Sequence, residues 1–439
     1  MGQLLFTPGQ AAALLFGVFF LLLVLRLPVA VALGLACLPM LALEPQLSLM
    51  LLVQETFNAY NSFILLAVPF FLLTANLMNI GGITDRLVRL SRALVGRMPG
   101  SLAQVNVVLS IFFAGISGSS TADAASQGKI FIEAQVKEGY DISFSVAITA
   151  VSAVMAVIIP PSILMIVWGG VLTTSIGALF LAGIIPGLLI GLVQMATVHV
   201  YAKRRGYPTY ASSSLNEMLR AFWVSIPALM TPVIIIGGKI FGWFTATESA
   251  AVAVIYAAVL SVLVYREMDL KGLYGALLDT GRLAGVTLFC VGTASAFGWI
   301  MAYYQIPQAL LGNILSWGMG PIGAGLFIAL VFLVVGCFLD AIPAIIIVGA
   351  ILQPLAKSVG MDPVHFAMIG IVSLAFGLVT PPYGLCLMIS CAIVNVRMST
   401  VLKDVIIMLL PMLGVLLMVI IWPQVSLFLP GLISPDMLK

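Results

Sequence analysis

Charged side chains are scarce in this sequence. Only 16 acidic and 19 basic residues occur among 439, which is 8% of the chain, whereas soluble globular domains carry about 25%. Hydrophobic residues make up 62%, and no hydrophilic stretch is long enough to fold as a separate soluble domain. These proportions exclude a water-soluble protein and indicate an all-α polytopic membrane protein, with the lipid bilayer as its solvent.

Basic clusters, cysteine motifs and histidines are also few. The net charge is only +3, and the basic residues fall in short loops, as membrane orientation requires, so we exclude nucleic acid as a partner. The five cysteines form no C-x-x-C pair, which argues against a disulfide framework or a metal knuckle. His199 and His365 are the two histidines, and both are expected near the ends of spans.

Apolar runs of about 20 residues or more recur along the chain, and two of them are interrupted. The first interruption, Gly115–Ser120, has the sequence GISGSS, and the second, Ile159–Ser162, has the sequence IPPS. Both have counterparts, Gly336 and Pro381-Pro382, at one offset (336 − 115 = 221; 381 − 160 = 221). The fixed offset predicts a tandem of two related halves.

Each half is expected to contain about five spans, an amphipathic arm helix on the membrane surface, one re-entrant hairpin and one broken span. The hairpin arms are too short to cross about 30 Å of hydrocarbon at 1.5 Å per residue. In the first half, residues 1–205, we expect the arm at 85–97, the hairpin at 101–136 and the broken span at 145–171. In the second half, residues 206–439, we expect the arm at 306–317, the hairpin at 321–357 and the broken span at 364–392.

The basic residues suggest how the chain is oriented. If the first arm is cytoplasmic, five spans per half place four other basic segments on the same side, as the positive-inside rule requires: Arg26, Lys203–Arg205, Arg266–Lys271 and Arg397–Lys403. An odd number of spans inverts one half relative to the other and predicts a periplasmic N-terminus. Inverted repeats with broken helices are the plan of many secondary transporters, whose site lies near the membrane midplane.

The broken helices suggest what is bound. Such breaks persist where they line a cavity or bind a ligand, because water cannot satisfy their backbone groups. Proline has no N–H, so the two proline pairs are expected to release the carbonyls of Ala156, Val157, Gly377 and Leu378. Freed carbonyls and hydroxyls are suitable ligands for dehydrated Na⁺, whereas helix N-termini favour an anion. We therefore expect a Na⁺ site in each half, between hairpin tip and broken span, with an anionic substrate between them.

The expected site residues come from the tips and the breaks, and Na⁺ is the only metal expected, with two or more ions coupled. For the first Na⁺ site they are Gly115, Ser117, Ser119, Ser120, Pro160 and Ser162. For the second Na⁺ site they are Gly336, Asp340, Gly377, Thr380 and Pro381. For the substrate they are Ser117, Thr121, Asp340, Pro382 and Tyr383. Asp340 is a candidate to bind a cation or a proton, because an acidic side chain inside a membrane is energetically costly and suggests a function.

Other interpretations of the same residues remain open. Glycine and serine also let membrane helices pack closely, and proline also kinks them. Asp123 follows a Ser/Thr cap, where an acid also stabilises a helix start. Gly115–Gly118 matches the G-x-S-G pattern of rhomboid-type intramembrane serine proteases, with Ser117 as nucleophile. That chemistry needs a histidine within reach of the serine at membrane depth. A passive channel is a third alternative.

Five motifs, in order along the chain, resemble one transporter family. They are 113–123 (FAGISGSSTAD), 159–162 (IPPS), 182–187 (AGIIPG), 244–248 (FTATE) and 377–384 (GLVTPPYG). They resemble the large membrane (M) subunit of tripartite ATP-independent periplasmic (TRAP) transporters, over essentially the whole chain. The resemblance implies an elevator-type ion-transporter fold and Na⁺-driven uptake of an organic anion across a bacterial inner membrane.

The resemblance also implies partners. A soluble periplasmic binding protein would deliver the substrate, and a small four-helix (Q) subunit would assist. Some members of the family fuse that small subunit to the N-terminus; since this sequence lacks the extra spans, a separate polypeptide is expected. The family handles C4-dicarboxylates, sialic acid, sugar acids and other carboxylates, and the sequence identifies none of them.

Overall fold

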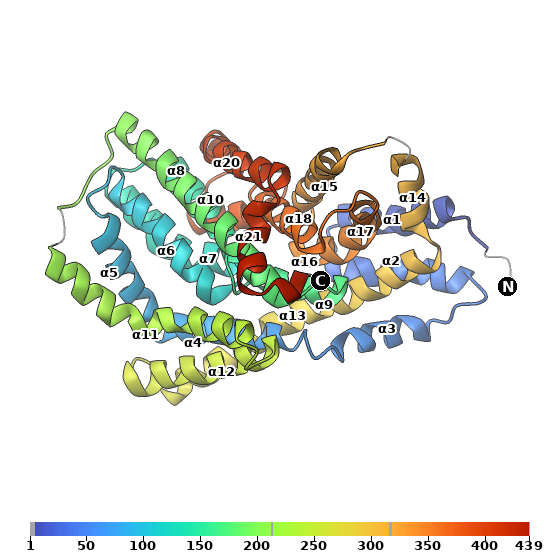
Figure 1. The fold of residues 1–439 in the computed structure, drawn as a ribbon, viewed down its shortest axis with the longest axis horizontal. Coiled ribbons are helices and arrows are strands. Elements are labelled where there is room, and N and C mark those ends of the chain that lie inside the picture. The colour runs from blue at the N-terminus through green and yellow to red at the C-terminus, as the bar shows by residue number, and fades with distance from the viewer. Residues whose placement is uncertain (1–4, 212–213, 316–317, 439) are drawn as a thin grey trace.

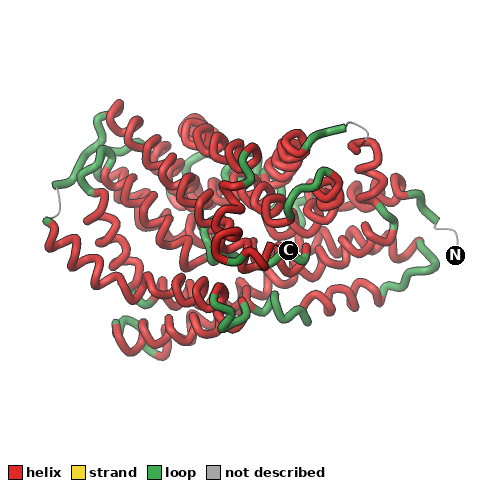
Figure 2. Tube along the Cα trace, viewed as in Figure 1, coloured by secondary structure: helices red, strands yellow, loops and turns green. Residues whose placement is uncertain are grey.

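The structure, a computed structural model, describes residues 5–211, 214–315 and 318–438. Within these ranges it consists of helices and loops and has no β-strand (Figure 2). The all-α class expected from the apolar runs is confirmed. Three parts of the predicted elements lie outside the described residues. They are residues 1–4 at the start of the first predicted half, residue 439 at the end of the second, and residues 316–317 of the second predicted arm.

The first part of the chain contains the two predicted interruptions as short gaps between helices. Its helices are α1 (Pro8–Val24), α2 (Val29–Leu43), α3 (Met50–Tyr60), α4 (Ala67–Ile80), α5 (Ile83–Val95), α6 (Ser101–Ser117), α7 (Ser120–Lys137), α8 (Ile142–Ala153) with the 3₁₀ turn η1 (Val154–Val157), α9 (Ile163–Leu172) and α10 (Ile176–Arg205). Helix α3 was not expected, because its sequence is less apolar than its neighbours and contains Gln54 and Glu55.

The second part of the chain has a similar succession of helices. They are α11 (Leu215–Ile240), α12 (Ala246–Val259) with the π-helical turn η2 (Leu260–Val264), α13 (Leu270–Tyr303), α14 (Ile306–Leu315), α15 (Pro321–Gly336), α16 (Ala341–Ala344), the π-helical turn η3 (Ile345–Gly349), α17 (Ala350–Ser358), α18 (Pro363–Gly377), α19 (Leu385–Ile393), α20 (Met398–Ile421), α21 (Gln424–Ile433) and the 3₁₀ turn η4 (Pro435–Leu438).

Several helix boundaries recur at the offset found in the sequence. Helix α7 and the continuous segment α16–η3–α17 are related by it at both their first and their last residues (341 − 120 = 221; 358 − 137 = 221). The last residues of α9 and α19 are related by it as well (393 − 172 = 221). The offset therefore relates equivalent helices as well as similar residues.

Six helical segments of the described chain are long and apolar enough to cross a membrane, or seven if the bent pair α4–α5 counts as one span. Helices α4 and α5 meet at 73°. Gly82 takes a left-handed backbone conformation at their junction, with φ of 73°. The hairpin arms α6 and α15 and the pieces α8, α9 and α18 of the broken spans are shorter apolar helices. The second arm of the second hairpin, Ala341–Ser358, is one of the six segments, so the expectation that every hairpin arm is too short to cross is wrong for this arm. The chain is thus a multi-span membrane protein whose helices are repeatedly interrupted.

The helices that pack around α4 and α13 and those that pack around the hairpins lie in different parts of the view in Figure 1. Helices α11, α4 and α12 lie along its lower edge, and α13 runs from them toward α2 and α3. Helix α4 packs against α12 and α13, and α13 packs against α2 and α3. The hairpins lie above this row in the same view, with α7 packed against α8 and α19, and α15 packed against α18. Helices from both halves therefore build each region.

A polar cluster joins α8, α10 and α20 at their ends. The Asp404 carboxylate is 3% exposed, and it accepts hydrogen bonds from Ser143, Tyr201 and Arg205. Arg205 also pairs with Asp141. A hydrogen bond from Tyr207 and the neighbouring Arg205 guanidinium hold the pKa of Asp141 below its usual range, so this carboxylate stays ionised. The cluster ties the loop before α8 to the ends of two long helices.

Two glycines allow α15 and α18 to touch through their backbones. A Cβ atom on Gly377 would lie 2.6 Å from the backbone carbon atoms of Gly336, and one on Gly336 would lie 3.2 Å from the Cα of Gly377. Real Cβ atoms essentially never come within 3.0 Å of another heavy atom, so the contact at Gly377 leaves no room for a side chain, and neither backbone can move without shifting its helix. The contact fixes the second hairpin against the second broken span.

We expect Gly377→Ala to destabilise the protein. The added methyl group would force α15 and α18 apart, and overpacking of this kind costs about 1–3 kcal/mol. Gly414→Ala is the matched control, because Gly414 lies in α20 with no atom within 4 Å of an added Cβ. Thermal unfolding in detergent should show a lower midpoint for Gly377→Ala only. Equal midpoints for the two variants would contradict this contact.

Candidate functional site

The first hairpin turns within two residues. Helix α6 ends at Ser117 and α7 begins at Ser120, so only Gly118 and Ser119 are non-helical. Gly118 has φ of 62°, and the Ser119 hydroxyl caps α7 by accepting from the N–H of Ala122 at 3.5 Å. Gly115 and Ser117, expected within the interruption, are helical instead, because glycine and serine can continue a helix that is packed on all sides.

The first tip contacts the first broken span. The N–H of Ile163 donates to the Gly118 carbonyl at 3.3 Å. Within the break, the Ser162 hydroxyl donates to the Val157 carbonyl at 2.7 Å and accepts from the N–H of Met165 at 3.4 Å. The Val157 carbonyl, expected to be free, therefore already has a partner. Ser162 acts as the N-cap of α9.

The second tip is built differently. Helix α15 ends at Gly336 and α16 begins at Ala341, whose N–H donates to the Asp340 carboxylate at 2.7 Å. The tip contacts the second broken span through a hydrogen bond of 3.1 Å from the N–H of Tyr383 to the carbonyl of Cys337. Each tip therefore lies against the broken span of its own half.

The second break also satisfies its own carbonyls. The Gly377 carbonyl accepts from the N–H of Thr380 at 3.0 Å, and the Leu378 carbonyl accepts from the N–H of Cys386 at 2.9 Å. The Thr380 hydroxyl donates to the Phe376 carbonyl at 2.7 Å. Backbone groups at membrane depth must be satisfied internally, and these contacts do so without an ion. Each carbonyl oxygen still has a second lone pair.

The two tips meet at one cavity of about 80 Å³. Of the predicted site residues, it brings together Ser119, Ser120, Thr121 and Asp340. The rest of its lining comes from the tips, the broken spans, α4 and α13: Leu72, Gly118, Val157, Ile163, Leu164, Thr287, Ala341, Ile342 and Leu378. The hydroxyls of the first tip and the carboxylate of the second come from opposite halves of the chain, so the cavity needs both halves.

The other predicted residues do not line this cavity. Gly336 and Gly377 form the close backbone contact described above, and Gly115 lies against Pro232, 3.3 Å from where its Cβ would be. The Tyr383 side chain is 43% exposed. Also outside the lining are Ser117, Pro160, Ser162, Thr380, Pro381 and Pro382. Among them, Ser162 caps α9, and Gly336 and Gly377 are points of close backbone approach.

Most residues that line the cavity outside the tips are not marked by the sequence. Leu72 lies in α4 and Thr287 lies in α13, and neither is near a break in the sequence. Leucine and threonine are ordinary residues of membrane helices, so nothing in the sequence marks these two. Only packing against the tips reveals their place in the cavity.

Two carboxylates lie close to the tips. Asp340 lines the cavity, and Asp123 is buried beside the Ser117 side chain. The Cys386 thiol of α19 lies beside the Ser120 hydroxyl and within electrostatic range of both carboxylates. One Asp123 oxygen, Oδ2, is buried without a hydrogen-bond partner in the described structure. An unpaired buried carboxylate oxygen is costly, and a cation would satisfy it.

The oxygen atoms at the tips fit Na⁺. Hard cations take oxygen ligands, and Ser119, Ser120, Thr121 and Asp340 supply hydroxyl and carboxylate oxygens. Among the described residues, no group of three or more His, Cys, Asp or Glu that could hold a metal ion is found. The oxygen atoms at the tips are of the kind that hard cations prefer.

The two hairpins differ in their interiors. In the first, the Asn106 amide donates to Thr149 at 2.8 Å and the Ser110 hydroxyl donates to Gln127 at 2.6 Å. These side chains are buried. The equivalent positions in the second half carry apolar residues or glycine: Phe327, Val331, Val348 and Gly370. The first hairpin is thus held by buried hydrogen bonds and the second by apolar packing, so the halves are not equivalent.

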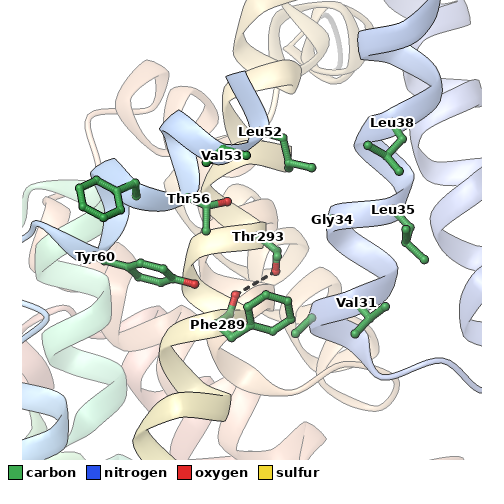
Figure 3. Close-up of a pocket in the computed structure, with 12 residues that line it drawn as sticks. Val31, Gly34, Leu35, Leu38, Leu52, Val53, Thr56, Tyr60, Phe289 and Thr293 are labelled. Carbon is green, nitrogen blue, oxygen red and sulfur yellow. Dashed lines mark hydrogen bonds between the residues drawn. The ribbon is translucent and has the colours of Figure 1, made fainter. Parts of the chain in front are cut away.

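A larger cavity of about 370 Å³ lies elsewhere, between α2, α3 and α13 (Figure 3). Its lining is mostly aliphatic and aromatic, including Leu35, Leu38 and Phe289. The Thr293 hydroxyl points at its own helix and donates to the Phe289 carbonyl at 3.1 Å. Its polar side chains are Thr56, Tyr60 and Thr293, and no charged residue lines it, so this cavity suits an ion less well than the cavity at the tips.

The protease alternative gains no support from the geometry. Neither histidine lines the cavity at the tips. His365 lies in the first turn of α18, and its Nε2 is 2.8 Å from the Val419 carbonyl of α20. The protease pattern needs a histidine within hydrogen-bond reach of the serine, and among the described residues no histidine contact to Ser117 is found.

Comparisons with known proteins identify relatives over most of the chain. It is 41% identical to the uncharacterized protein YgiK of Salmonella typhimurium, over 96% of this chain and 98% of that one. It is 38% identical to the sialic acid TRAP transporter large permease protein SiaM of Vibrio cholerae, over 92% and 95%. It is 36% identical to the C4-dicarboxylate TRAP transporter large permease protein DctM of Pseudomonas aeruginosa, over 86% and 88%.

A solved structure has a similar fold. The YdaH transporter of Alcanivorax borkumensis superposes with a TM-score of 0.57, covering 85% of this chain and 87% of that one at 14% identity. At this identity the likeness concerns the fold alone.

The family model of the tripartite ATP-independent periplasmic transporter, DctM component, matches residues 16–425. This is a family of transport proteins, so the chain is a transporter subunit and not an enzyme. The multi-span fold and the family together indicate an integral protein of the inner membrane. The chain therefore belongs to the DctM family, the large permease subunits of TRAP transporters.

Proposed function

We propose that this chain is the transport subunit of a Na⁺-coupled secondary active importer of small organic anions. The observation that carries the proposal is the cavity at which the two hairpin tips meet. It combines hydroxyls, a carboxylate and helix N-termini, which suit a cation and an anion side by side. The relatives' names, which include a sialic acid and a C4-dicarboxylate permease, support an anionic substrate.

Na⁺ has a specific role in this proposal. One site lies between the first tip and the first broken span, and another lies at the second tip with Asp340 as a ligand. Na⁺ bound at these two sites offsets the negative charge of the nearby carboxylates and orders the hairpin tips. Both effects raise the affinity of the cavity for the anionic substrate. By linkage the anion raises affinity for Na⁺ equally. The backbone carbonyls at the breaks would coordinate Na⁺ through their second lone pairs.

We further propose that the two halves, residues 1–205 and 206–439, are inverted repeats that work as an elevator. The recurrence of helix boundaries at one fixed offset supports two related halves (341 − 120 = 221). In this mechanism the hairpins and broken spans move together and carry the cavity across the membrane. The row formed by α4, α11, α12 and α13 would be the fixed scaffold.

The proposed transporter has two protein partners. A periplasmic binding protein hands over the substrate, and a separate small four-helix membrane subunit completes the permease. The N-terminus lies on the periplasmic side, so the basic loops are cytoplasmic. This arrangement follows the positive-inside rule.

We predict that uptake requires a Na⁺ gradient. The three components are reconstituted in proteoliposomes, and uptake of substrate is measured with an inward gradient of Na⁺ and then of K⁺. Uptake should occur with Na⁺ and fall to the level of empty liposomes with K⁺. Equal uptake under both gradients would refute Na⁺ coupling.

We also predict that the combined replacement Ser119→Ala, Ser120→Ala and Thr380→Ala raises the Na⁺ concentration for half-maximal uptake. Loss of about 1.4 kcal/mol of Na⁺ binding corresponds to a tenfold increase. Thr400→Ala is the control, because its hydroxyl is exposed and donates to the Arg397 carbonyl. An unchanged Na⁺ requirement in the triple variant would place the cations elsewhere.

A further inference from the structure

The corner between α4 and the first arm, α5, is held by a segment from the other half of the chain. The Arg86 guanidinium pairs with the Glu267 carboxylate at 2.8 Å and donates to the Gly82 carbonyl at 2.6 Å. It also lies over the Tyr265 ring, 3.7 Å from the ring centroid, where a cation is attracted to the aromatic face. Tyr265 and Glu267 lie in the connection between η2 and α13. We call Arg86, Tyr265 and Glu267 the first clasp.

Close packing at the first corner supports this clasp. The Ser261 hydroxyl of η2 donates to the Leu77 carbonyl of α4 at 3.0 Å. The Glu267 carboxylate occupies the space that a Cβ atom on Gly82 would need. Gly82 has φ of 73°, a conformation that glycine adopts without strain. The connection between η2 and α13 therefore lies directly against the backbone of the corner.

The corner between α13 and the second arm, α14, is held by a segment from the first half. The hydroxyl of Tyr304, the C-cap residue of α13, donates to the Glu44 carboxylate at 2.9 Å. Glu44 is 2% exposed and also accepts from the N–H of Leu5 at 3.0 Å. A buried carboxylate is costly without such partners. We call Glu44 and Tyr304 the second clasp, and it ties this corner to the residues that follow α2.

The two clasps lie at equivalent places in the two halves. Tyr265 is equivalent to Glu44, and Glu267 is equivalent to Gln46 (265 − 44 = 221; 267 − 46 = 221). Tyr303 is equivalent to Gly82 (303 − 82 = 221), and the Tyr303 hydroxyl donates to the Gln46 side chain at 3.4 Å. The two arms lie at opposite ends of the view in Figure 1. Each half therefore holds the corner of the other half's arm.

We infer that Arg86 and Tyr304 are positioning residues for transport, each of which fixes the corner of one arm to the opposite half of the chain. This inference rests on the proposed function and names residues that its mechanism needs. Neither residue lines the cavity at the tips. A loosened corner would let the arm follow its hairpin, so less of the movement would carry the cavity. Loss of a clasp therefore slows transport and leaves the affinity for Na⁺ unchanged.

The first clasp is tested by uptake in proteoliposomes that contain all three components, under an inward Na⁺ gradient. Arg86→Gln should lower the maximal rate of uptake by roughly tenfold and change the Na⁺ concentration for half-maximal uptake by less than about twofold. Arg89→Gln is the matched control, because Arg89 is an exposed residue of the same helix, and it should behave as the wild type. Arg86→Lys keeps the charge without the planar contacts, so its rate should lie between the two.

A double variant shows whether Arg86 acts through Glu267. Because both residues belong to one contact, Arg86→Gln combined with Glu267→Gln should reduce uptake no further than Arg86→Gln alone. Two effects that multiply would mean that Arg86 acts elsewhere.

The second clasp is tested by removing a single hydroxyl group. Tyr304→Phe should lower the maximal rate of uptake by about threefold or more, again with the Na⁺ requirement unchanged. Tyr274→Phe is the matched control, because Tyr274 lies on the same helix with its side chain 63% exposed. Should Arg86→Gln not fold, Tyr304→Phe and Arg86→Lys are the variants that decide.

Hydrogen exchange gives a readout that does not depend on transport. In the purified permease, Arg86→Gln should speed exchange of backbone N–H groups in residues 77–86, and Arg89→Gln should not. Unchanged exchange in residues 77–86 would overturn the first clasp.

Two uptake results would overturn the inference. One is uptake by Arg86→Gln and Tyr304→Phe at the level of their controls. The other is a raised Na⁺ requirement at an unchanged maximal rate, because the two residues would then act through the cavity. If the wild type itself takes up substrate equally without a Na⁺ gradient, the proposed function fails instead, and the exchange measurement still decides whether Arg86 holds its corner.

Discussion

A helix that ends inside a membrane leaves backbone groups that hydrocarbon cannot satisfy. The described chain has four such interruptions, two at hairpin tips and two at broken spans, and a backbone hydrogen bond joins each tip to a break. The Gly118 carbonyl accepts from the N–H of Ile163, and the Cys337 carbonyl accepts from the N–H of Tyr383. Because each tip needs its break, the hairpins must lie against the broken spans, and the cavity forms where the two tips then meet.

The pairing also explains why the halves can differ without losing the site. The first tip supplies hydroxyls, whereas the second supplies Asp340 and apolar side chains. Behind the first tip, buried hydrogen bonds such as that between Ser110 and Gln127 join the arms of the hairpin. Behind the second, a glycine contact holds α15 against α18. The two tips therefore supply different groups to the same cavity: hydroxyls from the first and a carboxylate from the second.

The sequence predicted the all-α membrane fold, the family, and the positions of tips and breaks, because proline, glycine and a fixed offset mark them directly. It predicted cavity residues where hydroxyls or acids follow a break, as at Ser119 and Asp340. It failed where the role depends on packing: Ser162 is used as a cap, and Thr287 joins the lining from a distant helix. The prediction that the proline pairs leave backbone carbonyls free was also wrong in part. The Val157, Gly377 and Leu378 carbonyls accept hydrogen bonds from nearby N–H or hydroxyl groups.

The most direct test of the account is hydrogen exchange at the two tips, measured by mass spectrometry on the purified permease in Na⁺ and in K⁺. If both tips form one ion-dependent site, Na⁺ should slow exchange of backbone N–H groups in residues 117–123 and in residues 337–344 together. Exchange that slows at only one tip, or at neither, would contradict the claim that the two halves build a single Na⁺-dependent cavity.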